Sequence, residues 1–215
     1  VVTYRVSNRP NLESVAMLNT DADPQADDGW ATGEGGVLFR YDLRADPLRL
    51  TWSQWTLADN NNTPLPTQGL KAVSMRNSGE GWAVGDGGAI YRFSNNRWQA
   101  AASPTARDLT AVSITPGGEG MAVGENGEVL IYNPNQGSWV RDPTAGANLT
   151  AIKAFSDAKG WGAGEQGTII RKLGGVWADP GDSGTVVPPG VGNTNLRGID
   201  MLPQQSNVTD WRESN

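Results

Sequence analysis

The feature that most constrains this chain is a short segment that occurs four times. The copies are GWATGEGGVLFRY from Gly29, GWAVGDGGAIYRF from Gly81, GMAVGENGEVLIY from Gly120 and GWGAGEQGTIIRK from Gly160. Each copy is an apolar run, an acidic turn with flanking glycines and a second apolar run, which predicts a β-hairpin. One hairpin cannot bury its own faces, so the repetition predicts an architecture in which neighbouring units stack.

Two further segments complete each repeat. The upstream segment begins with leucine, and its five copies are LESVAML from Leu12, LKAVSMR from Leu70, LTAVSIT from Leu109, LTAIKAF from Leu149 and LRGIDML from Leu196. The downstream segment carries tryptophan, and successive copies hold Trp52 and Trp55, then Trp98, Trp139 and Trp177. Four strands in a unit of about 40 residues are typical of a propeller blade. We therefore predict an all-β protein, a β-propeller of four-stranded antiparallel blades forming a single domain over residues 1–215, with blades that begin near residues 12, 70, 109, 149 and 196.

The two ends of the sequence match parts of one further blade. Residues 1–6, VVTYRV, align with the second strand of the hairpin, and Asp210-Trp211 aligns with the Gly-Trp that opens its first strand. We predict five blades, the last completed by residues 1–6, so that pairing of N- and C-terminal strands closes the ring and removes its open edges. The alternative is that the chain is a fragment of a larger surface protein.

Composition excludes several classes of function. The net charge of −6 argues against a nucleic-acid partner, which would need a basic surface. The chain has no His and no Cys, and so lacks the commonest general base and the thiolate ligands of metal sites. It has no apolar run of about 18 residues, so we expect no membrane insertion. We predict no cofactor, no metal site and no catalytic residue.

The nine tryptophans fall at repeat positions, which predicts that most of them form the core between blades. Trp52 and Trp55 are the least periodic. They are the candidates for an alternative role, in which an exposed ring stacks on a sugar.

Charged residues also recur with the repeat. Arg40, Arg92 and Arg171 occupy one position of the third strand in their blades. Such a guanidinium either stacks on an aromatic ring and pairs with a carboxylate, or reaches the rim and contributes to an arc of arginines that binds a partner. The hairpin turns carry carboxylates that we expect to accept backbone N–H groups, or else to form a ring that binds a cation or acts as an acid/base pair: Glu34, Asp86, Glu125 and Glu165.

Two connections between blades are long. One spans residues 57–69 and contains Asn60, Asn61 and Asn62, and the other spans residues 181–195. In a four-stranded up-and-down blade, the connection to the next blade leaves from the same end as the central hairpin turn. The insertions and the acidic turns should therefore share one face, and we assign the three asparagines to a candidate partner-binding surface there.

The stretches AVGDGGAIYRFSNNRW and GAGEQGTIIRKLGGVW resemble repeats of photosystem II assembly and stability-factor-like β-propellers, and of the wider BNR/Asp-box superfamily that includes sialidases. The resemblance extends over nearly the whole chain. The assembly-factor branch implies a non-catalytic scaffold outside the cytoplasm with a basic patch for partners. Arg40, Arg92 and Arg171 match the strand position at which such a patch would arise.

The function that follows is a non-enzymatic binding or assembly propeller with a protein partner, in an extracytoplasmic location (periplasmic, cell surface or secreted). The alternative is a glycan-binding or glycoside-hydrolysing propeller of sialidase-like type. In that case Trp52 and Trp55 would stack on the sugar, and Glu34 or Asp86 would act as the acid.

Overall fold

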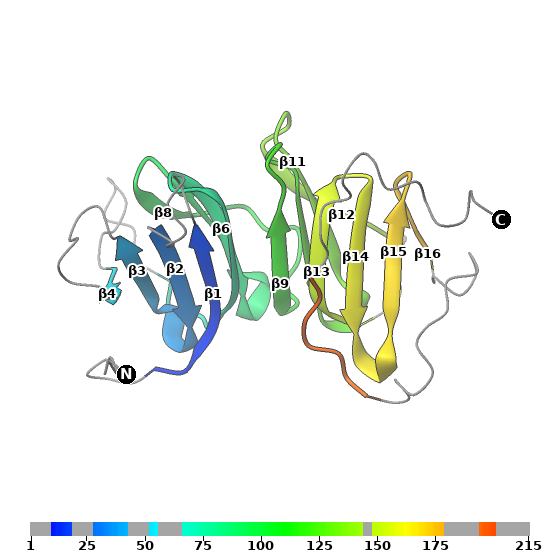
Figure 1. Ribbon diagram of the computed structural model, residues 1–215, viewed down its shortest axis with the longest axis horizontal. Helices are drawn as coiled ribbons and strands as arrows, with labels where there is room; N and C mark the ends of the chain where they lie inside the picture. Colours follow the sequence, from blue (N-terminus) through cyan, green and yellow to red (C-terminus); the bar gives the residue numbers. More distant parts are fainter. Residues whose placement is uncertain are drawn as a thin grey trace, which may run out of the picture.

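The computed structural model describes residues 10–18, 28–42, 52–55, 66–143, 148–178 and 194–200. These residues form four antiparallel sheets of four strands each, and within every sheet the strands are neighbours in sequence order (Figure 1). The predicted all-β propeller architecture is therefore confirmed. Apart from strands, the regular elements of the described residues are four short 3₁₀ turns, one in each central hairpin.

The strand bounds follow the repeats. Blade 1 comprises β1 (Leu12–Leu18), β2 (Asp28–Gly33), β3 (Leu38–Asp42) and β4 (Trp52–Gln54). Blade 2 comprises β5 (Leu70–Asn77), β6 (Glu80–Gly85), β7 (Ile90–Ser94) and β8 (Arg97–Ala100). Blade 3 comprises β9 (Leu109–Ile114), β10 (Gly120–Gly124), β11 (Val129–Asn133) and β12 (Ser138–Arg141). Blade 4 comprises β13 (Leu149–Ser156), β14 (Lys159–Gly164), β15 (Ile169–Leu173) and β16 (Val176–Ala178).

The blades follow one another in an arc, and blades 1 and 4 lie at its two ends (Figure 1). The first strands of consecutive blades are joined by serine hydroxyls, which come from the fifth residue of β5 and β9 and from the third residue of β1. Ser14 Oγ accepts a hydrogen bond of 3.2 Å from the Val73 N–H, and Ser74 Oγ accepts one of 3.1 Å from Ile114. Ser113 Oγ accepts one of 3.0 Å from Ala154. The contact between blades 3 and 4 thus repeats the contact between blades 2 and 3, whereas Ser14 links blades 1 and 2 from a different position.

The core lies between blades rather than within them. Trp30 and Leu38 of blade 1 pack with Leu70 and Val73 of blade 2, and two similar clusters join blades 2 to 3 and 3 to 4. The tryptophans that the structure buries are Trp30, Trp82, Trp98, Trp139 and Trp177. This confirms the prediction that most of the periodic tryptophans are core residues.

Glycine is required where each second strand ends. A Cβ on Gly85 would lie 1.9 Å from the carbonyl oxygen of Gly69, and one on Gly164 would lie 1.9 Å from that of Asn148. The backbone here is extended, so close approach of two chain segments is the reason for glycine.

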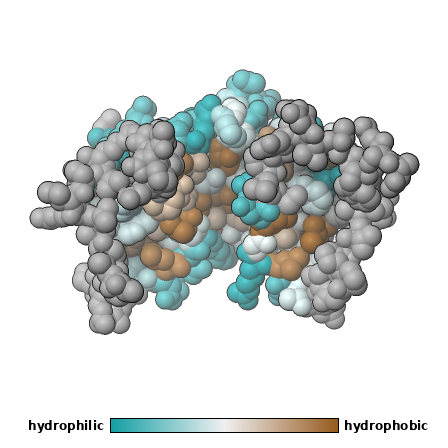
Figure 2. All heavy atoms as spheres, viewed as in Figure 1, coloured by the Kyte–Doolittle hydropathy of each residue, from teal (hydrophilic) through white to brown (hydrophobic). Residues whose placement is uncertain are grey.

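The outer face of blade 1 has no covering blade in the described part of the chain. Leu12 is 51% exposed, whereas Leu70, Leu109 and Leu149 at the same repeat position are at most 1% exposed. Figure 2 shows apolar atoms gathered over β1. The predicted fifth blade would involve residues 1–6 and Asp210-Trp211, which lie outside the described residues, and closure of the ring stays a prediction.

Residues 194–200 lie against blade 4, where the next first strand would be expected. The Leu196 carbonyl accepts a hydrogen bond from Thr150 Oγ1, as the Leu149 carbonyl does from Thr110 Oγ1 between blades 3 and 4. Lys153 Nζ lies 3.0 Å from Asp200 Oδ1. No strand is formed within these described residues.

Candidate functional site

The acidic turns lie beside the segments that lead into the first strands. The Asp86 N–H donates to the Gly69 carbonyl at 2.9 Å, and the Glu125 N–H donates to the Asp108 carbonyl at 3.0 Å. The second residue of each turn has a left-handed backbone, with φ near +60° at Gly87 and Asn126. The turns and the inter-blade connections therefore occupy the same end of the sheets, as the sequence predicted.

Three of the four turn carboxylates, those of Glu34, Asp86 and Glu165, bond side chains, in contrast to the expectation that they accept backbone N–H groups. Asn11 Nδ2 donates to Glu34 at 2.9 Å, and Asn148 Nδ2 donates to Glu165 at 3.0 Å. The backbone of the turns bonds instead to the residue that precedes the next blade. The Gly87 N–H donates to Asp108 Oδ1 at 2.7 Å, for example. The turn positions thus tie neighbouring blades together.

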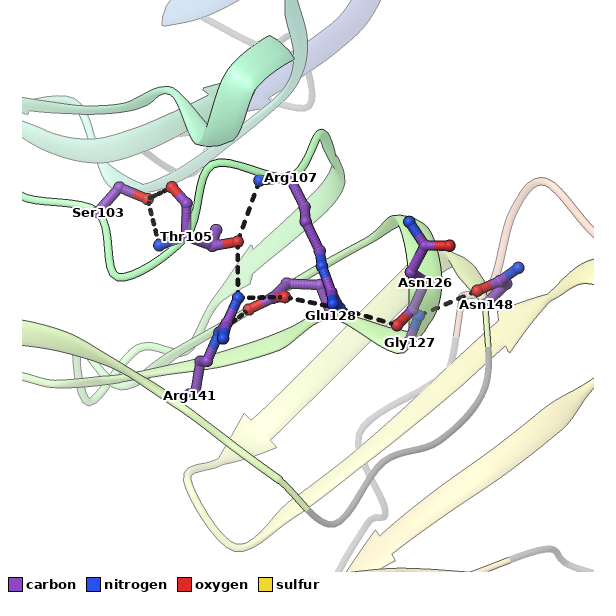
Figure 3. Close-up of polar contacts among 8 residues, drawn as sticks. All are labelled: Ser103, Thr105, Arg107, Asn126, Gly127, Glu128, Arg141 and Asn148. Carbon is purple, nitrogen blue, oxygen red and sulfur yellow. Dashed lines mark hydrogen bonds and ion pairs between the residues drawn. The ribbon is translucent and has the colours of Figure 1, made fainter.

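At this end of blade 3, two arginines surround a buried carboxylate (Figure 3). The side chain of Glu128 is 2% exposed, and Arg141 binds it with both Nε, at 2.6 Å, and Nη2, at 2.9 Å. Arg107 Nη1 lies 3.2 Å from the same carboxylate. The two arginine side chains are nevertheless 47% and 52% exposed. A guanidinium has five N–H donors, so each arginine is held in place and keeps donors for a further acceptor.

Other contacts fix the direction of both guanidinium groups. Arg141 Nη2 donates to Thr105 Oγ1 at 3.2 Å, and Arg107 Nη1 donates to the Asn126 carbonyl at 3.1 Å (Figure 3). Thr105 belongs to the connection from blade 2, and Asn126 belongs to the acidic turn of blade 3. The pair is therefore built across a blade boundary.

Next to this pair is a cavity of about 220 Å³ between blades 3 and 4. Its polar lining includes Glu125 and Glu165, and its other residues are Thr110, Gly124, Asn126, Asn148, Leu149 and Thr150. Asn126 contacts Arg107 as well, so the cavity adjoins the arginine pair. We use the name junction site for Arg107, Glu128, Arg141 and this cavity.

The three arginines predicted from the sequence to bind a partner, Arg40, Arg92 and Arg171, lie outside the junction site. Arg40 Nη2 is 3.3 Å from Asp28 Oδ2, and its guanidinium is 5.5 Å from the centroid of the Trp30 ring. Arg92 Nη2 is 2.8 Å from Glu80 Oε1. Asp28 and Glu80 begin second strands whose other ends lead into the acidic turns, so these arginines point to the opposite end of the sheets.

Each of these arginines contacts a tryptophan of its own blade. The guanidinium of Arg92 lies 5.5 Å from the Trp82 ring, and that of Arg171 lies 5.7 Å from the Trp161 ring. These contacts match the structural alternative that the sequence left open. The structure does not bring the arginines together with the acidic turns, and their role as a partner-binding arc stays a prediction.

The remaining candidates do not form one site. Asn60, Asn61 and Asn62 lie outside the described residues. Trp55 packs edge-on against Trp30 at 5.0 Å between ring centroids and joins the core of blades 1 and 2. Trp52 contacts Tyr41 at 5.7 Å. A role of Trp52 and Trp55 in glycan binding stays a prediction.

Burial and two neighbouring arginines shift the pKa of Glu80 in opposite directions. Burial disfavours its charge, but hydrogen bonds from Arg76 and Arg92 outweigh burial and hold the pKa of Glu80 below its usual value. The folded state therefore binds a proton at Glu80 less readily than the unfolded state does. This contribution to stability is complete above the pKa of the unfolded state and is lost as the pH falls through the lower, folded-state pKa.

We expect the Glu80→Gln variant to be less stable than the original chain at pH 7, and we expect this difference to shrink on acidification below about pH 4.5, the ordinary value for Glu. Urea unfolding of both chains, followed by circular dichroism at several pH values, measures this difference in stability. A difference that grows on acidification would contradict the assignment.

Repeat analysis alone missed the junction site. Glu128 stands where the other copies carry Val37, Ala89 and Thr168, so departure from the repeat is the signal that marks it. In the ranges that the structure describes, no three His, Cys, Asp or Glu side chains are grouped to hold a metal ion, and no helix is long and apolar enough to cross a membrane.

Comparisons with known proteins place the chain among β-propellers. No protein-family model matches the sequence, and no curated protein matches it. Similar solved structures include YCF48 bound to D1 peptide, with a TM-score of 0.56 and 21% identity over 83% of this chain and 55% of that chain. The structure of U3-55K has a TM-score of 0.59 and 9% identity, over 76% of this chain and 49% of that chain.

The WD40 repeats of RRP9 are similar to the same extent, with a TM-score of 0.57 and 9% identity over 76% of this chain and 48% of that chain. At these identities the likeness shows the propeller fold. The chain spans about half the length of these structures.

Proposed function

We propose that this chain is a non-enzymatic propeller that binds a protein partner through the junction site. The observation that carries the proposal is the pair of half-exposed arginines, Arg107 and Arg141, held by the buried Glu128 beside a cavity. The similarity to YCF48, whose structure contains a bound peptide, supports a peptide-binding role for a propeller of this kind.

The geometry favours binding because the arginines are already ordered. A flexible arginine loses about 0.5–1.5 kcal/mol of side-chain entropy when an interface immobilises it. Here Glu128, Thr105 and the Asn126 carbonyl hold the two guanidinium groups before any partner arrives. Arginine pairs readily with a carboxylate in a two-point contact, so we expect the bound segment to contain an acidic group.

The proposal is tested by selecting binders from a random 12-residue peptide library on the immobilised chain and measuring their affinity by calorimetry. We expect the Arg107→Ala/Arg141→Ala variant to bind the selected peptides at least about tenfold more weakly, because interface arginines are often worth about 2 kcal/mol. Arg92→Ala/Arg171→Ala is the matched control, with the same change of net charge at the other end of the sheets.

Two results would overturn the assignment. Peptides that bind the Arg107→Ala/Arg141→Ala variant with unchanged affinity would remove the junction site from the interface. Loss of binding only in the Arg92→Ala/Arg171→Ala variant would favour the arginine arc. The absence of catalysis and the extracytoplasmic location stay predictions.

A further inference from the structure

A lysine side chain fills the boundary between blades 2 and 3 at the end that carries the acidic turns. Lys71, the second residue of β5, places Nζ 2.9 Å from Asp86 Oδ1 and 2.8 Å from Asp108 Oδ2. Asp86 is in the turn of blade 2, and Asp108 precedes β9 of blade 3. The hydrogen bonds from Lys71 and from the Gly87 N–H hold the pKa of Asp108 below its usual value. An ammonium group thus ties the two blades.

The equivalent position between blades 3 and 4 has no lysine. By repeat position, Thr110 replaces Lys71, Glu125 replaces Asp86 and Asn148 replaces Asp108. All three replacements line the cavity of about 220 Å³. The shorter threonine turns to the backbone, where its Oγ1 bonds the carbonyls of Val123 at 3.2 Å and Leu149 at 3.0 Å.

The lining of the cavity therefore keeps one of the two carboxylates that receive an ammonium group one blade earlier, since Glu125 stands in place of Asp86, whereas Asn148 presents an amide in place of the Asp108 carboxylate. Glu165 adds a second carboxylate to Glu125, and Asn148 Nδ2 orients it with a hydrogen bond of 3.0 Å. In the described part of the chain, the Glu125 carboxylate has no hydrogen bond or ion pair. Two carboxylates in one cavity favour a cation over an anion.

The size of the cavity suits one side chain. Its volume of about 220 Å³ is below the roughly 300–1,000 Å³ typical of sites for drug-sized molecules. An ammonium group is compact and has three N–H donors, so it can bond two carboxylates at once. The broad, planar guanidinium group of an arginine matches this arrangement less well.

We propose that this cavity binds the side chain of a lysine from the protein partner. The proposal rests on the proposed function, and it adds the residue type that the partner presents beside the acidic group. Lys71 shows, within the same chain, how such a side chain is held.

The test uses n-butylammonium chloride as a probe for the lysine side chain, followed by NMR of the backbone amides. We expect saturable shifts at Asn126, Gly127 and Asn148, and no such shifts with the uncharged n-butanol or with sodium chloride at the same ionic strength. The Glu125→Gln/Glu165→Gln variant should bind the probe at least about fivefold more weakly.

Two variants of Thr110 form a matched pair for this titration. Thr110→Lys copies Lys71 and fills the cavity with the chain's own ammonium group, so the probe shifts should vanish. Thr110→Val removes the hydroxyl without filling the cavity, so the shifts should persist. Equal probe shifts in the original chain and in Thr110→Lys, or no saturable shift in the original chain, would overturn the proposal.

The peptide selection separates this inference from the proposed function. Acetylation of the critical lysine in a selected peptide should weaken its binding at least about tenfold. Peptides that depend on Arg107 and Arg141 but tolerate acetylation of every lysine would retain the proposed function and overturn the lysine site. A shift with n-butylammonium but no selected peptide would instead overturn the proposed function.

Discussion

Replacing Asp142 by alanine is expected to lower the free energy of unfolding by about 3–5 kcal/mol, because it leaves a buried ammonium group without its counter-ion. Lys172 Nζ lies 2.6 Å from Asp142 Oδ2, and the two side chains are only 4% and 7% exposed. The same carboxylate oxygen accepts a hydrogen bond of 3.1 Å from Trp177 Nε1. Urea unfolding of Asp142→Ala followed by circular dichroism measures the loss.

The chain itself supplies the control for this variant. Ala101 and Tyr132 occupy the positions of Asp142 and Lys172 one blade boundary earlier, and Tyr132 is 2% exposed. The Asp142→Ala/Lys172→Tyr variant copies that pair and should recover most of the lost stability, because a buried ion pair is often replaced by apolar groups without cost. A double variant as unstable as Asp142→Ala would show that the lost charge pair is not the cause.

Replacing Trp30 by alanine is expected to cost about 3–5 kcal/mol, the usual range for removal of a large aromatic side chain from a core. Trp30 is fully buried. Its ring centroid lies 4.7 Å from that of Phe93, 5.0 Å from that of Trp55 and 5.3 Å from that of Trp98. Removal of the indole would leave the boundary between blades 1 and 2 without its central ring. Guanidinium unfolding followed by circular dichroism measures the change.

The matched control is Trp30→Met, which copies blade 3. There Met121 occupies the position of Trp30 and is completely buried. Trp30→Met keeps a flexible apolar side chain at the boundary and should cost clearly less than Trp30→Ala. A loss below about 1 kcal/mol for Trp30→Ala would show that neighbouring side chains close the gap, and would place the main core of this boundary elsewhere.

The fold was predictable because the same pattern returns with the same period. Alternating apolar residues, the acidic turn and the tryptophan segment each occur in every described blade. A strand that is ambiguous in one repeat can therefore be assigned from the equivalent segments of the other repeats. The core could be predicted for the same reason, since periodic tryptophans such as Trp30 and Trp82 lie where a blade meets its neighbour.

The junction site could not be predicted by the same logic, because it depends on departures from the repeat. Glu128 stands where the other blades carry uncharged side chains, and Thr110 stands where blade 2 carries Lys71. Their contacts also join segments of different blades, as between Arg141 and Thr105. Spacing along the chain does not determine such contacts, which depend on how one sheet packs against the next.

The end of the sheet toward which the side chains of Arg40 and Arg92 point was likewise not predictable from the repeat pattern. Their strand positions were clear from the sequence, but their direction depends on Asp28 and Glu80, which begin the neighbouring strands and attract the guanidinium groups. A recurrent cation is therefore weak evidence for a binding surface when a recurrent carboxylate lies one strand away.

The serine links between the first strands have a consequence for cooperativity. Ser74 and Ser113 make the same bond at two successive boundaries, and Ser14 links blades 1 and 2 in a similar way, so the energy of the arc is close to a sum of nearest-neighbour terms, as in a one-dimensional array. Blade 1 has a single boundary among the described residues, whereas blades 2 and 3 have two. Opening should therefore start at blade 1 or blade 4 and spread inward, so that the cavity at the boundary with blade 4 opens before the arginine pair on blade 3.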